Sequence, residues 1–490
     1  MFKFLEHNCK YRKRLEELEI RFSEMENRMA VLLGRVEQLE QENAILKAEN
    51  AQLKLENAQL RAENAELKEK LAQYEHPKDS SNSSIPPSQD PHRRRYPKKE
   101  KSGRSAGAQK GHPGHHHPWS HTPDEIIPLH PQTCTHCGSG DFFLLPGHQE
   151  ARQEVEVPKI QAHVKEYQRY EGICQHCGQR NQAIFPEHLK APVQMGNSID
   201  ALAGYLKVGH HASHDKIAVF FRDILGIPFS HGGVQAALKR LSARLKPEYQ
   251  GLIELCRNQS VLHSDETTSR IGTQSAYFWV FVAKSVCVFV SDKTRSFQVI
   301  LRTIGEAFNG TWVSDRYGAQ LKIKAKRRQL CLAHLIRDCE YLIDAERSSW
   351  GFQLKTLLQK AIQLRNQVGE NWNPLEPQIQ TMIRQLQGQL DDLFLKPPRR
   401  KKSKRLFTQL SKRKHHIFTF LEDPDIPPTN NEAERAIRRY VIHRRVNGNF
   451  KTSTGADDHA VLNSMIESAR RQGKDILQVL SLQQSLLQAT

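Results

Sequence analysis

The sequence predicts a multidomain protein: an N-terminal parallel coiled coil, a small cysteine-rich unit, a small all-α module, and an α/β domain with a helical insertion. Three observations predict this architecture. Apolar residues repeat every seven positions near the N-terminus, two Cys-x-x-Cys pairs follow, and strand-like apolar runs that lead into aspartates begin near residue 260. At 490 residues the chain is also too long for a single hydrophobic core.

The heptad repeat predicts a leucine zipper within residues 1–75. One core position holds Met25, Leu32, Leu39, Leu46, Leu53, Leu60, Leu67 and Tyr74; the other holds Leu15, Phe22, Met29, Val36, Asn43, Asn50, Asn57, Asn64 and Leu71. Leucine at this spacing keeps one seam facing a partner helix, and the asparagines favour a parallel two-stranded arrangement. We therefore expect this segment to form a homodimer.

The charge distribution predicts a polyanionic partner. Lys and Arg outnumber Asp and Glu by 72 to 54, and the excess is concentrated in runs at 93–110, 322–328, 396–414 and 435–445. Clustered cations of this kind favour nucleic acid, since each neutralised phosphate releases counterions. The N-terminus does not resemble a signal peptide, and the most apolar stretch is too short to span a bilayer. We expect a cytoplasmic, nucleoid-associated protein that binds DNA and no membrane.

Residues 76–128 are predicted to form a disordered basic linker, because this polar, Pro- and Gly-rich stretch has too few apolar residues to form a core. The two Cys-x-x-Cys pairs lie in the next unit, 129–190, and each is followed by glycine, as in a zinc knuckle. Four thiolates suit a closed tetrahedral site, so the sequence predicts a structural Zn²⁺ ribbon rather than a redox pair. The expected ligands are Cys134, Cys137, Cys174 and Cys177.

Residues 191–256 have helical periodicity and predict a small all-α module. Two of its helices are joined through Gly226, and Ser230 stands where an N-cap is expected. A short turn followed by a helix that bears Lys239 and Arg240 resembles a DNA-binding helix-turn-helix. An ordinary helical bundle explains the same pattern, and both interpretations stay open.

Residues 257–345 predict three antiparallel strands, a helix and a parallel strand, which is the strand order of an RNase H-like domain. Asp265 and Asp315 follow the first and fourth strands, so their carboxylates are expected to converge at one sheet edge. Carboxylates at such an edge suit a pair of Mg²⁺ (or Mn²⁺) ions, which favour in-line phosphodiester cleavage. A third carboxylate is expected from a later helix.

The order of the segments HSDETT, VSDRYGA, CLAHLIRD and TNNEAERAIR resembles the transposases of the insertion sequence 66 family, in the DDE superfamily. The resemblance extends to the zipper, the SSNSS-containing linker and the paired cysteines. It implies a catalytic triad of Asp265, Asp315 and Glu434, with Glu432 facing elsewhere on the same helix. The chain departs from the family in having Leu332 in place of a common Trp and Arg316 in place of a frequent Gly.

Further residues follow from the same resemblance. His334 matches a family histidine, either at the site or in the core, and the polar positions around the Glu are matched by Asn430, Asn431, Arg435 and Arg438. Residues 346–424 are expected to form a basic helical insertion facing DNA. The second part of the catalytic domain is expected at 425–473, and 474–490 form a C-terminal tail.

The resemblance implies an enzyme that binds the terminal inverted repeats of an insertion sequence and catalyses metal-dependent cleavage and strand transfer, sometimes with small accessory proteins. The alternative is a zipper-dimerised, zinc-containing DNA-binding regulator without catalysis. That reading leaves the three carboxylates without a role. An inactive, domesticated derivative is a third possibility, against which the intact carboxylate set counts.

Overall fold

A computed structural model describes residues 2–75, 111, 118–147, 150–158 and 160–487. Most of the linker predicted at 76–128 lies outside these described residues. Two compact units are distinguished, an N-terminal one dominated by a long helix and a larger one that contains the mixed α/β fold. The described helices include none with the length and apolarity needed to cross a membrane.

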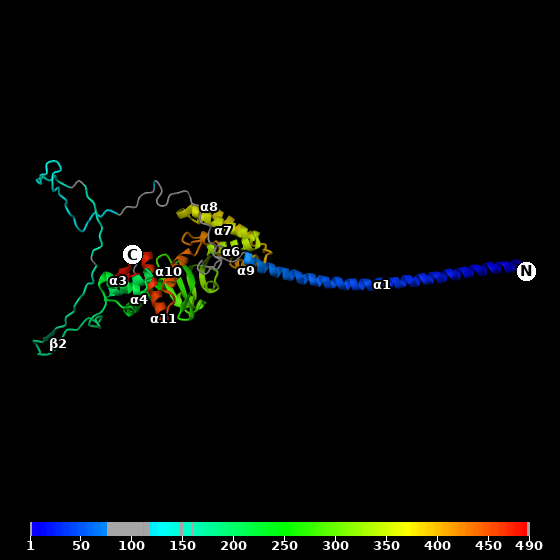
Figure 1. Cartoon of the computed structure of the whole chain (residues 1–490), viewed down its shortest axis with the longest axis horizontal. Helices are drawn as coiled ribbons and strands as arrows, with labels where there is room; N and C mark the ends of the chain where they lie inside the picture. The colour runs from blue at the N-terminus through cyan, green and yellow to red at the C-terminus, as the bar shows by residue number, and fades with distance from the viewer. Residues whose placement is uncertain (1, 76–110, 112–117, 148–149, 159, 488–490) are drawn as a thin grey trace. The chain divides into compact units, whose positions relative to one another are not determined.

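The N-terminal helix, α1 (Phe2–Glu75), runs unbroken for 74 residues (Figure 1). Its heptad side chains between Leu15 and Leu67 are exposed on the single helix: Leu46 keeps 54% of its surface accessible and Leu60 keeps 51%. Asn57 donates from its side chain to the carbonyl of Leu53, four residues earlier, and Asn50 and Asn64 do the same one heptad away on either side. The expected zipper seam thus lies exposed along one helix as a row of leucines beside a row of asparagines.

Both Cys-x-x-Cys segments form the same tight turn. The N–H of Gly138 donates to the carbonyl of Cys134 at 2.9 Å, and that of Gly178 donates to Cys174 at 2.8 Å. Both glycines have positive φ, 75° and 72°, which is why glycine follows each pair. Only the second turn is flanked by strands, β1 (Glu171–Ile173) and β2 (Arg180–Gln182). The described residues of 150–170 form no strand, although their β-branched residues alternate along the chain.

The module predicted at 191–256 is helical. It comprises α2 (Asn197–Gly204), a π-helical turn η1 (Tyr205–Gly209), α3 (His214–Leu225) and α4 (His231–Arg257). Ser230 caps α4 as predicted, since its hydroxyl accepts the N–H of Gly233 at 3.0 Å. The module shares one hydrophobic core with the sheet, in which Phe221 and Leu252 belong to the same buried cluster as Trp279.

The central sheet has five strands in the order β5-β4-β3-β6-β7. β3, β4 and β5 are antiparallel, whereas β6 runs parallel to β3, and β7 parallel to β6. This is the predicted order of three antiparallel strands followed by parallel ones. The strands are β3 (Val261–Ile271), β4 (Gln274–Val282), β5 (Cys287–Asp292), β6 (Ala307–Ser314) and β7 (Lys324–Leu330).

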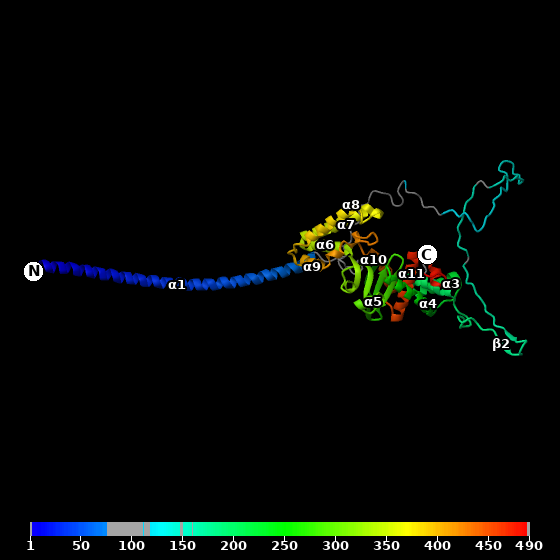
Figure 2. The ribbon, with the colours of Figure 1, turned by 180° about the vertical axis from the view of Figure 1, so that it is seen from behind.

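Helices cover both faces of the sheet (Figure 2). On one face Phe278 and Phe289 pack against α10 (Asn431–Asn447) and the start of α11 (Ser453–Gln472). On the other face Trp279 packs in a cluster with α4 and α5 (Phe297–Thr303). β4 is buried on both faces, which explains its nearly continuous apolar sequence.

The free edge of β5 is protected by α11. The hydroxyl of Ser464 accepts the backbone N–H of Phe289 at 2.8 Å, and that of Ser468 accepts the N–H of Cys287 at 3.0 Å. Two serines one turn apart on a helix therefore satisfy donors that an edge strand would otherwise expose. A short helix, α12 (Ile476–Leu480), follows α11 and contributes Val479 to the same core.

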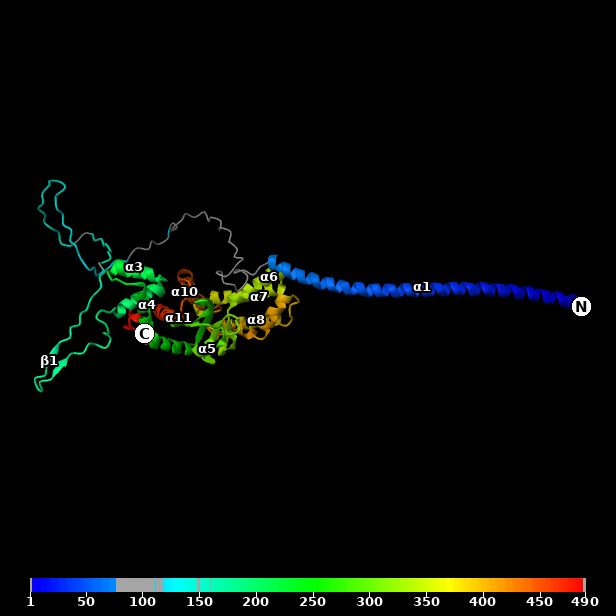
Figure 3. The ribbon, with the colours of Figure 1, turned by 60° about the horizontal axis from the view of Figure 1, so that its bottom comes forward.

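The insertion predicted at 346–424 is helical throughout most of its length, and α7 and α8 lie side by side (Figure 3). Trp350 packs edge-on against Phe394 and Phe407, which joins its three α-helices. Besides β7, the elements between β6 and α10 are η2 (Gln320–Lys322), α6 (Leu332–Glu346), α7 (Ser349–Val368), η3 (Gly369–Asn371), α8 (Pro377–Leu393), α9 (Lys401–Ser411), η4 (Lys414–His416) and η5 (Thr419–Leu421).

Candidate active site

Asp265 and Asp315 lie at matching positions just beyond the parallel pairing of β3 and β6. The last parallel pair between β3 and β6 joins His263 to Val313, and each aspartate lies two residues beyond that pair. Because side chains alternate along a strand, positions in register point to the same face. β3 continues past Asp265 to Ile271 as the partner of β4, so the aspartate ends the parallel pairing rather than the strand itself.

The aspartates are held by backbone groups and shielded from solvent. Oδ1 of Asp265 accepts the N–H of Glu266, and Oδ1 of Asp315 accepts the N–H of Tyr317, both at 2.9 Å. Burial raises the pKa of Asp265 well above its ordinary value, and repulsion from Glu266, Asp315 and Glu434 raises it further. Burial also raises the pKa of Asp315. Asp315 and Glu434, from distant segments of the chain, thus lie close enough to Asp265 to influence its pKa.

Glu434 joins this site from the first turn of α10, and Glu432 does not. Oε1 of Glu434 lies 3.6 Å from His334 Nδ1 and 3.8 Å from Arg337 Nη2, yet it is buried without a hydrogen-bond partner. Burial raises the pKa of Glu434, Arg337 opposes that shift, and repulsion from Asp315 adds to it.

Glu432, by contrast, is bound by two arginines, Arg435 at 3.2 Å and Arg471 at 3.1 Å. The two glutamates are separated by about 200° around the helix, which accounts for their different surroundings.

Glu266, the neighbour of Asp265, is a supporting residue. Its carboxylate accepts from Arg295 at 2.6 Å and from Gln320 at 2.7 Å, and only 1% of its side chain is exposed. The Arg295 guanidinium stacks 3.8 Å from the centre of the Tyr317 ring, and the Tyr317 hydroxyl donates to the Arg295 carbonyl. This network ties β3 to the turn that follows Asp315.

His334 lies at the site, at the start of α6. Its Nδ1 is 3.2 Å from the sulfur of Cys331, which also accepts the backbone N–H of Asn430 at 3.2 Å. The side chain of Asn430 in turn bonds His263 and the carbonyl of Ser264 on β3. Burial, together with Arg337 and Arg316, lowers the pKa of His334 to about 3, so the imidazole is neutral near pH 7.

The basic residues predicted to contact DNA have unequal surroundings. Lys239 is exposed, whereas Arg240 pairs at 2.7 Å with Asp200, a fully buried aspartate that also binds Arg244 at 2.9 Å. Arg435 remains 70% exposed despite its pairing with a glutamate. Arg240 therefore also stabilises the helical module.

Arg438, the fourth of these residues, lies close enough to Glu434 to lower its pKa. Arg316, where the family often has glycine, pairs with Asp338 on α6 and donates to Gln409 on α9 at 3.3 Å.

Among the described residues, Cys331, His334 and Glu434 form a group whose possible metal-ligating atoms all lie within 4.8 Å of one another. The four knuckle cysteines do not form such a group, although backbone hydrogen bonds in each turn lower the pKa of Cys134 and Cys174. Sequence reasoning overlooked Cys331 as a site residue. The signal was its Cys-x-x-His spacing to His334, which places Cys331 directly before α6 and His334 in its first turn.

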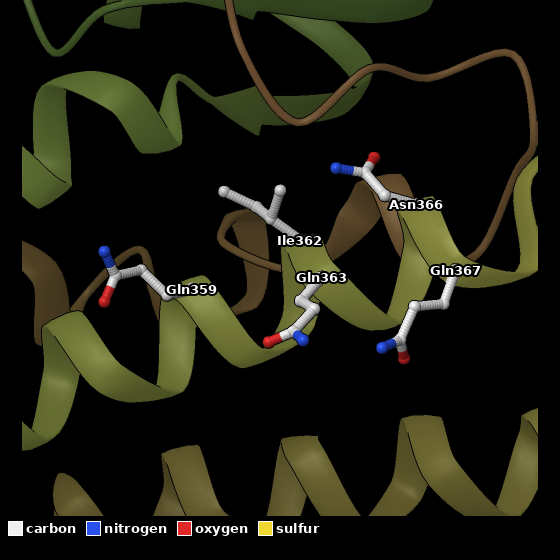
Figure 4. A pocket seen from close by; sticks show the side chains of 5 residues that line it. All are labelled: Gln359, Ile362, Gln363, Asn366 and Gln367. Atoms are coloured by element: carbon white, nitrogen blue, oxygen red, sulfur yellow. The ribbon is translucent and has the colours of Figure 1, made fainter. Parts of the chain in front are cut away.

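A separate hollow of about 370 Å³ lies along α7. Its lining consists of amide side chains and one isoleucine: Gln359, Ile362, Gln363, Asn366 and Gln367 (Figure 4). None of these side chains is charged or nucleophilic, so the hollow lacks the chemistry of the carboxylate site.

The protein thus has a mixed α/β fold with acidic side chains at the end of its parallel strand pairing. Residues 192–458 match the Transposase IS66 family, and the chain belongs to that family. Membership implies a function in transposition. Residues 35–118 also match a family of unknown function.

A relative from Sinorhizobium fredii, the uncharacterized protein y4jD, is 23% identical over 321 residues, covering 57% of this chain and 61% of that protein. The chain thus spans less than two thirds of the length of this relative.

Proposed function

We propose that the protein is a DDE transposase that cleaves DNA at the terminal inverted repeats of an insertion sequence and joins the freed ends to target DNA. The observation that carries this proposal is the convergence of three carboxylates from separate segments. Asp265 and Asp315 each lie two residues beyond the last parallel pair of β3 and β6, and Glu434 lies in the first turn of α10, close enough to Asp265 to raise its pKa. The sheet around them has the strand order expected of an RNase H-like catalytic domain.

The donor set fits hard divalent cations such as Mg²⁺ or Mn²⁺. Each aspartate accepts one backbone N–H through Oδ1, which leaves its other oxygen for a ligand, and Oε1 of Glu434 is buried without a hydrogen bond. Carboxylate oxygens are the ligands that these ions prefer. When bound by Asp265, Asp315 and Glu434, two such ions would stabilise charge on the attacking and leaving oxygens.

The surrounding side chains influence the ionisation and the position of these carboxylates. Arg337 and Arg438 favour the ionised form of Glu434 against the effect of burial. Glu266 is neutralised by Arg295, so it repels the aspartates less than a free carboxylate would. Neutral His334 cannot act as a general acid near pH 7, and its contact with Cys331 fixes the ring beside Glu434.

Two phosphoryl transfers would follow. In the first, the oxygen of water bonds to phosphorus at the element end, and the 3′-oxygen leaves and takes up a proton, giving a 3′-hydroxyl. In the second, that hydroxyl oxygen bonds to a phosphorus of the target strand, and the target's own 3′-oxygen leaves. The second step is an exchange of one phosphodiester for another, so it needs no external energy source.

The other segments of the chain would bind DNA and form the homodimer. The exposed apolar stripe of α1 favours a parallel homodimer, which would pair two catalytic units on the two element ends. The two knuckles would supply Cys134, Cys137, Cys174 and Cys177 to a structural Zn²⁺. Basic positions at Lys239, Arg240, Arg435 and Arg438, with the basic helical insertion, would contact the phosphate backbone.

The direct test is metal-dependent nicking of DNA that carries candidate inverted repeats. Asp265→Asn, Asp315→Asn and Glu434→Gln should each abolish nicking and strand transfer, while Glu432→Gln serves as the matched control on the same helix. Retained strand transfer in Asp265→Asn would refute the catalytic assignment. DNA binding without nicking by the unaltered protein would favour the regulator or the inactive derivative. Zinc content measured on the purified protein tests the ribbon independently.

A further inference from the structure

The segment around Glu434 contains donors that the hard-cation site does not use. Cys331 lies between β7 and α6, His334 lies in the first turn of α6, and Glu434 comes from α10. One potential ligand atom of each lies within 4.8 Å of the other two. A sulfur, a nitrogen and a carboxylate oxygen are the three donor types that Zn²⁺ and similar ions accept.

Two of the three distances between these atoms are close to those around a tetrahedral ion, and the third is within 4.8 Å. Zn²⁺ bonds of about 2.3 Å to sulfur and about 2.0–2.1 Å to nitrogen or oxygen place neighbouring ligand atoms about 3.4–3.6 Å apart. In the structure His334 Nδ1 lies 3.2 Å from Cys331 Sγ and 3.6 Å from Glu434 Oε1. Shifts of a few tenths of an ångström would therefore bring both edges to coordination distances.

Two of the donors, Glu434 and Cys331, have contacts that bear on metal binding. Oε1 of Glu434 is buried and makes no hydrogen bond, so it is free to accept a cation. The backbone N–H of Asn430 donates to Cys331 Sγ at 3.2 Å, an outer-shell contact of the kind that orients metal-bound thiolates. Arg337, 3.8 Å from the same Oε1, competes with a cation and makes this site weaker than a closed four-cysteine site.

We infer that Cys331, His334 and Glu434 form a second, thiophilic metal site that binds Zn²⁺ or a similar ion with one coordination position open. Glu434 is shared with the carboxylate site, so an ion held here withdraws the third carboxylate from the hard-cation set. Zinc is then an antagonist of the magnesium-dependent reaction. This regulatory consequence rests on the proposed function, whereas the binding itself does not.

The binding experiment compares the full-length protein with variants by zinc content after equilibration with micromolar Zn²⁺ and gel filtration. Cys331→Ser and His334→Gln should each hold about one zinc ion fewer per chain than the unaltered protein. Cys339→Ser replaces another buried cysteine of α6 that lies outside the group, and it should retain the full content.

Titration with Co²⁺ gives a second readout. Cys331→Ser and His334→Gln should both lose the part of the thiolate-to-cobalt absorption that this site contributes, and Cys339→Ser should keep it. Because both measurements are differences between variants, they hold whatever the knuckles bind. Equal zinc content and equal cobalt spectra in Cys331→Ser and the unaltered protein would overturn the site.

The inhibition experiment measures nicking at fixed Mg²⁺ while Zn²⁺ is raised, with each variant normalised to its own rate without zinc. The Zn²⁺ concentration that halves the rate should rise at least about tenfold in Cys331→Ser, because one of three protein ligands is lost. Zinc bound through Cys331 with unchanged inhibition would refute the link to Glu434. An unaltered protein that binds this zinc but never nicks DNA would contradict the proposed function and leave the metal site standing.

Discussion

Gly310 offers a sharp test of how the sheet positions the two aspartates. It lies in β6, and a Cβ added there would come within 2.5 Å of the Ser260 carbonyl oxygen and 2.7 Å of that of Gln259. Both are backbone atoms, so neither can rotate away as a side chain would. The Ser260 oxygen also accepts the N–H of Thr311, the contact that starts the pairing of β6 with β3.

Gly310→Ala should therefore destabilise the protein by about 1–3 kcal/mol or somewhat more, the usual range for overpacking a tight interior. The urea midpoint, followed through the fluorescence of the buried Trp279 and Trp312, measures this loss. The nicking rate should fall by more than the loss of folded protein explains, because a shift of β6 moves Asp315 relative to Asp265.

The matched control is Gly388→Ala, on the exposed face of α8, where an added Cβ meets nothing within 4 Å. That change should stabilise the helix by roughly 0.5–1 kcal/mol, since alanine loses less backbone entropy than glycine. A Gly310→Ala protein as stable and as active as the unaltered one would show that the close contact between β3 and β6 does not determine the relative positions of Asp265 and Asp315.

Three further changes test other parts of the molecule. Asp200→Ala should lower the free energy of unfolding by about 3 kcal/mol, which urea denaturation measures. This is the lower end of the range for breaking a buried ion pair, because the two arginine partners of Asp200 keep contact with solvent. Leu60→Cys in α1 should oxidise to an interchain disulfide on a non-reducing gel, and Ala62→Cys, on the outer face, should not; the reverse result would contradict a parallel zipper. Burial lowers the pKa of His443 to about 3 and that of His459 well below its ordinary 6.5. The unfolded chain therefore takes up protons first, so stability should be complete above pH 6.5 and fall by about 1.4 kcal/mol per pH unit per histidine on acidification. Unchanged urea midpoints between pH 7 and 5 would refute that account.

Local patterns in the sequence predicted much of the fold. The heptad leucines predicted α1 because residues seven positions apart lie on the same side of a helix. The apolar runs around Lys284 predicted β4 and β5, and Ser230 marked the start of α4. The aspartates after the first and fourth strands could be placed together because adjacent parallel strands end at one edge.

The acidic side chains next to the proposed ligands could not be assigned in this way. Glu432 and Glu434 have similar local sequences, and only the packed structure shows two arginines on the first and a buried, unbonded oxygen on the second. The same holds for Arg240, whose partner Asp200 is distant in sequence. Ion pairs depend on which segments meet in space, and local periodicity contains no information about that.

The sequence by itself thus determined most of the helices and strands, their order, and the two aspartates of the candidate site, because these depend on periodicity and on neighbouring residues. Tertiary structure alone decided that Cys331, His334 and Glu434 converge, that Asn430 ties α10 to β3, and that the helical module shares a core with the sheet. These contacts join segments separated by the whole helical insertion or by other elements. They form only when the hydrophobic core brings the segments together.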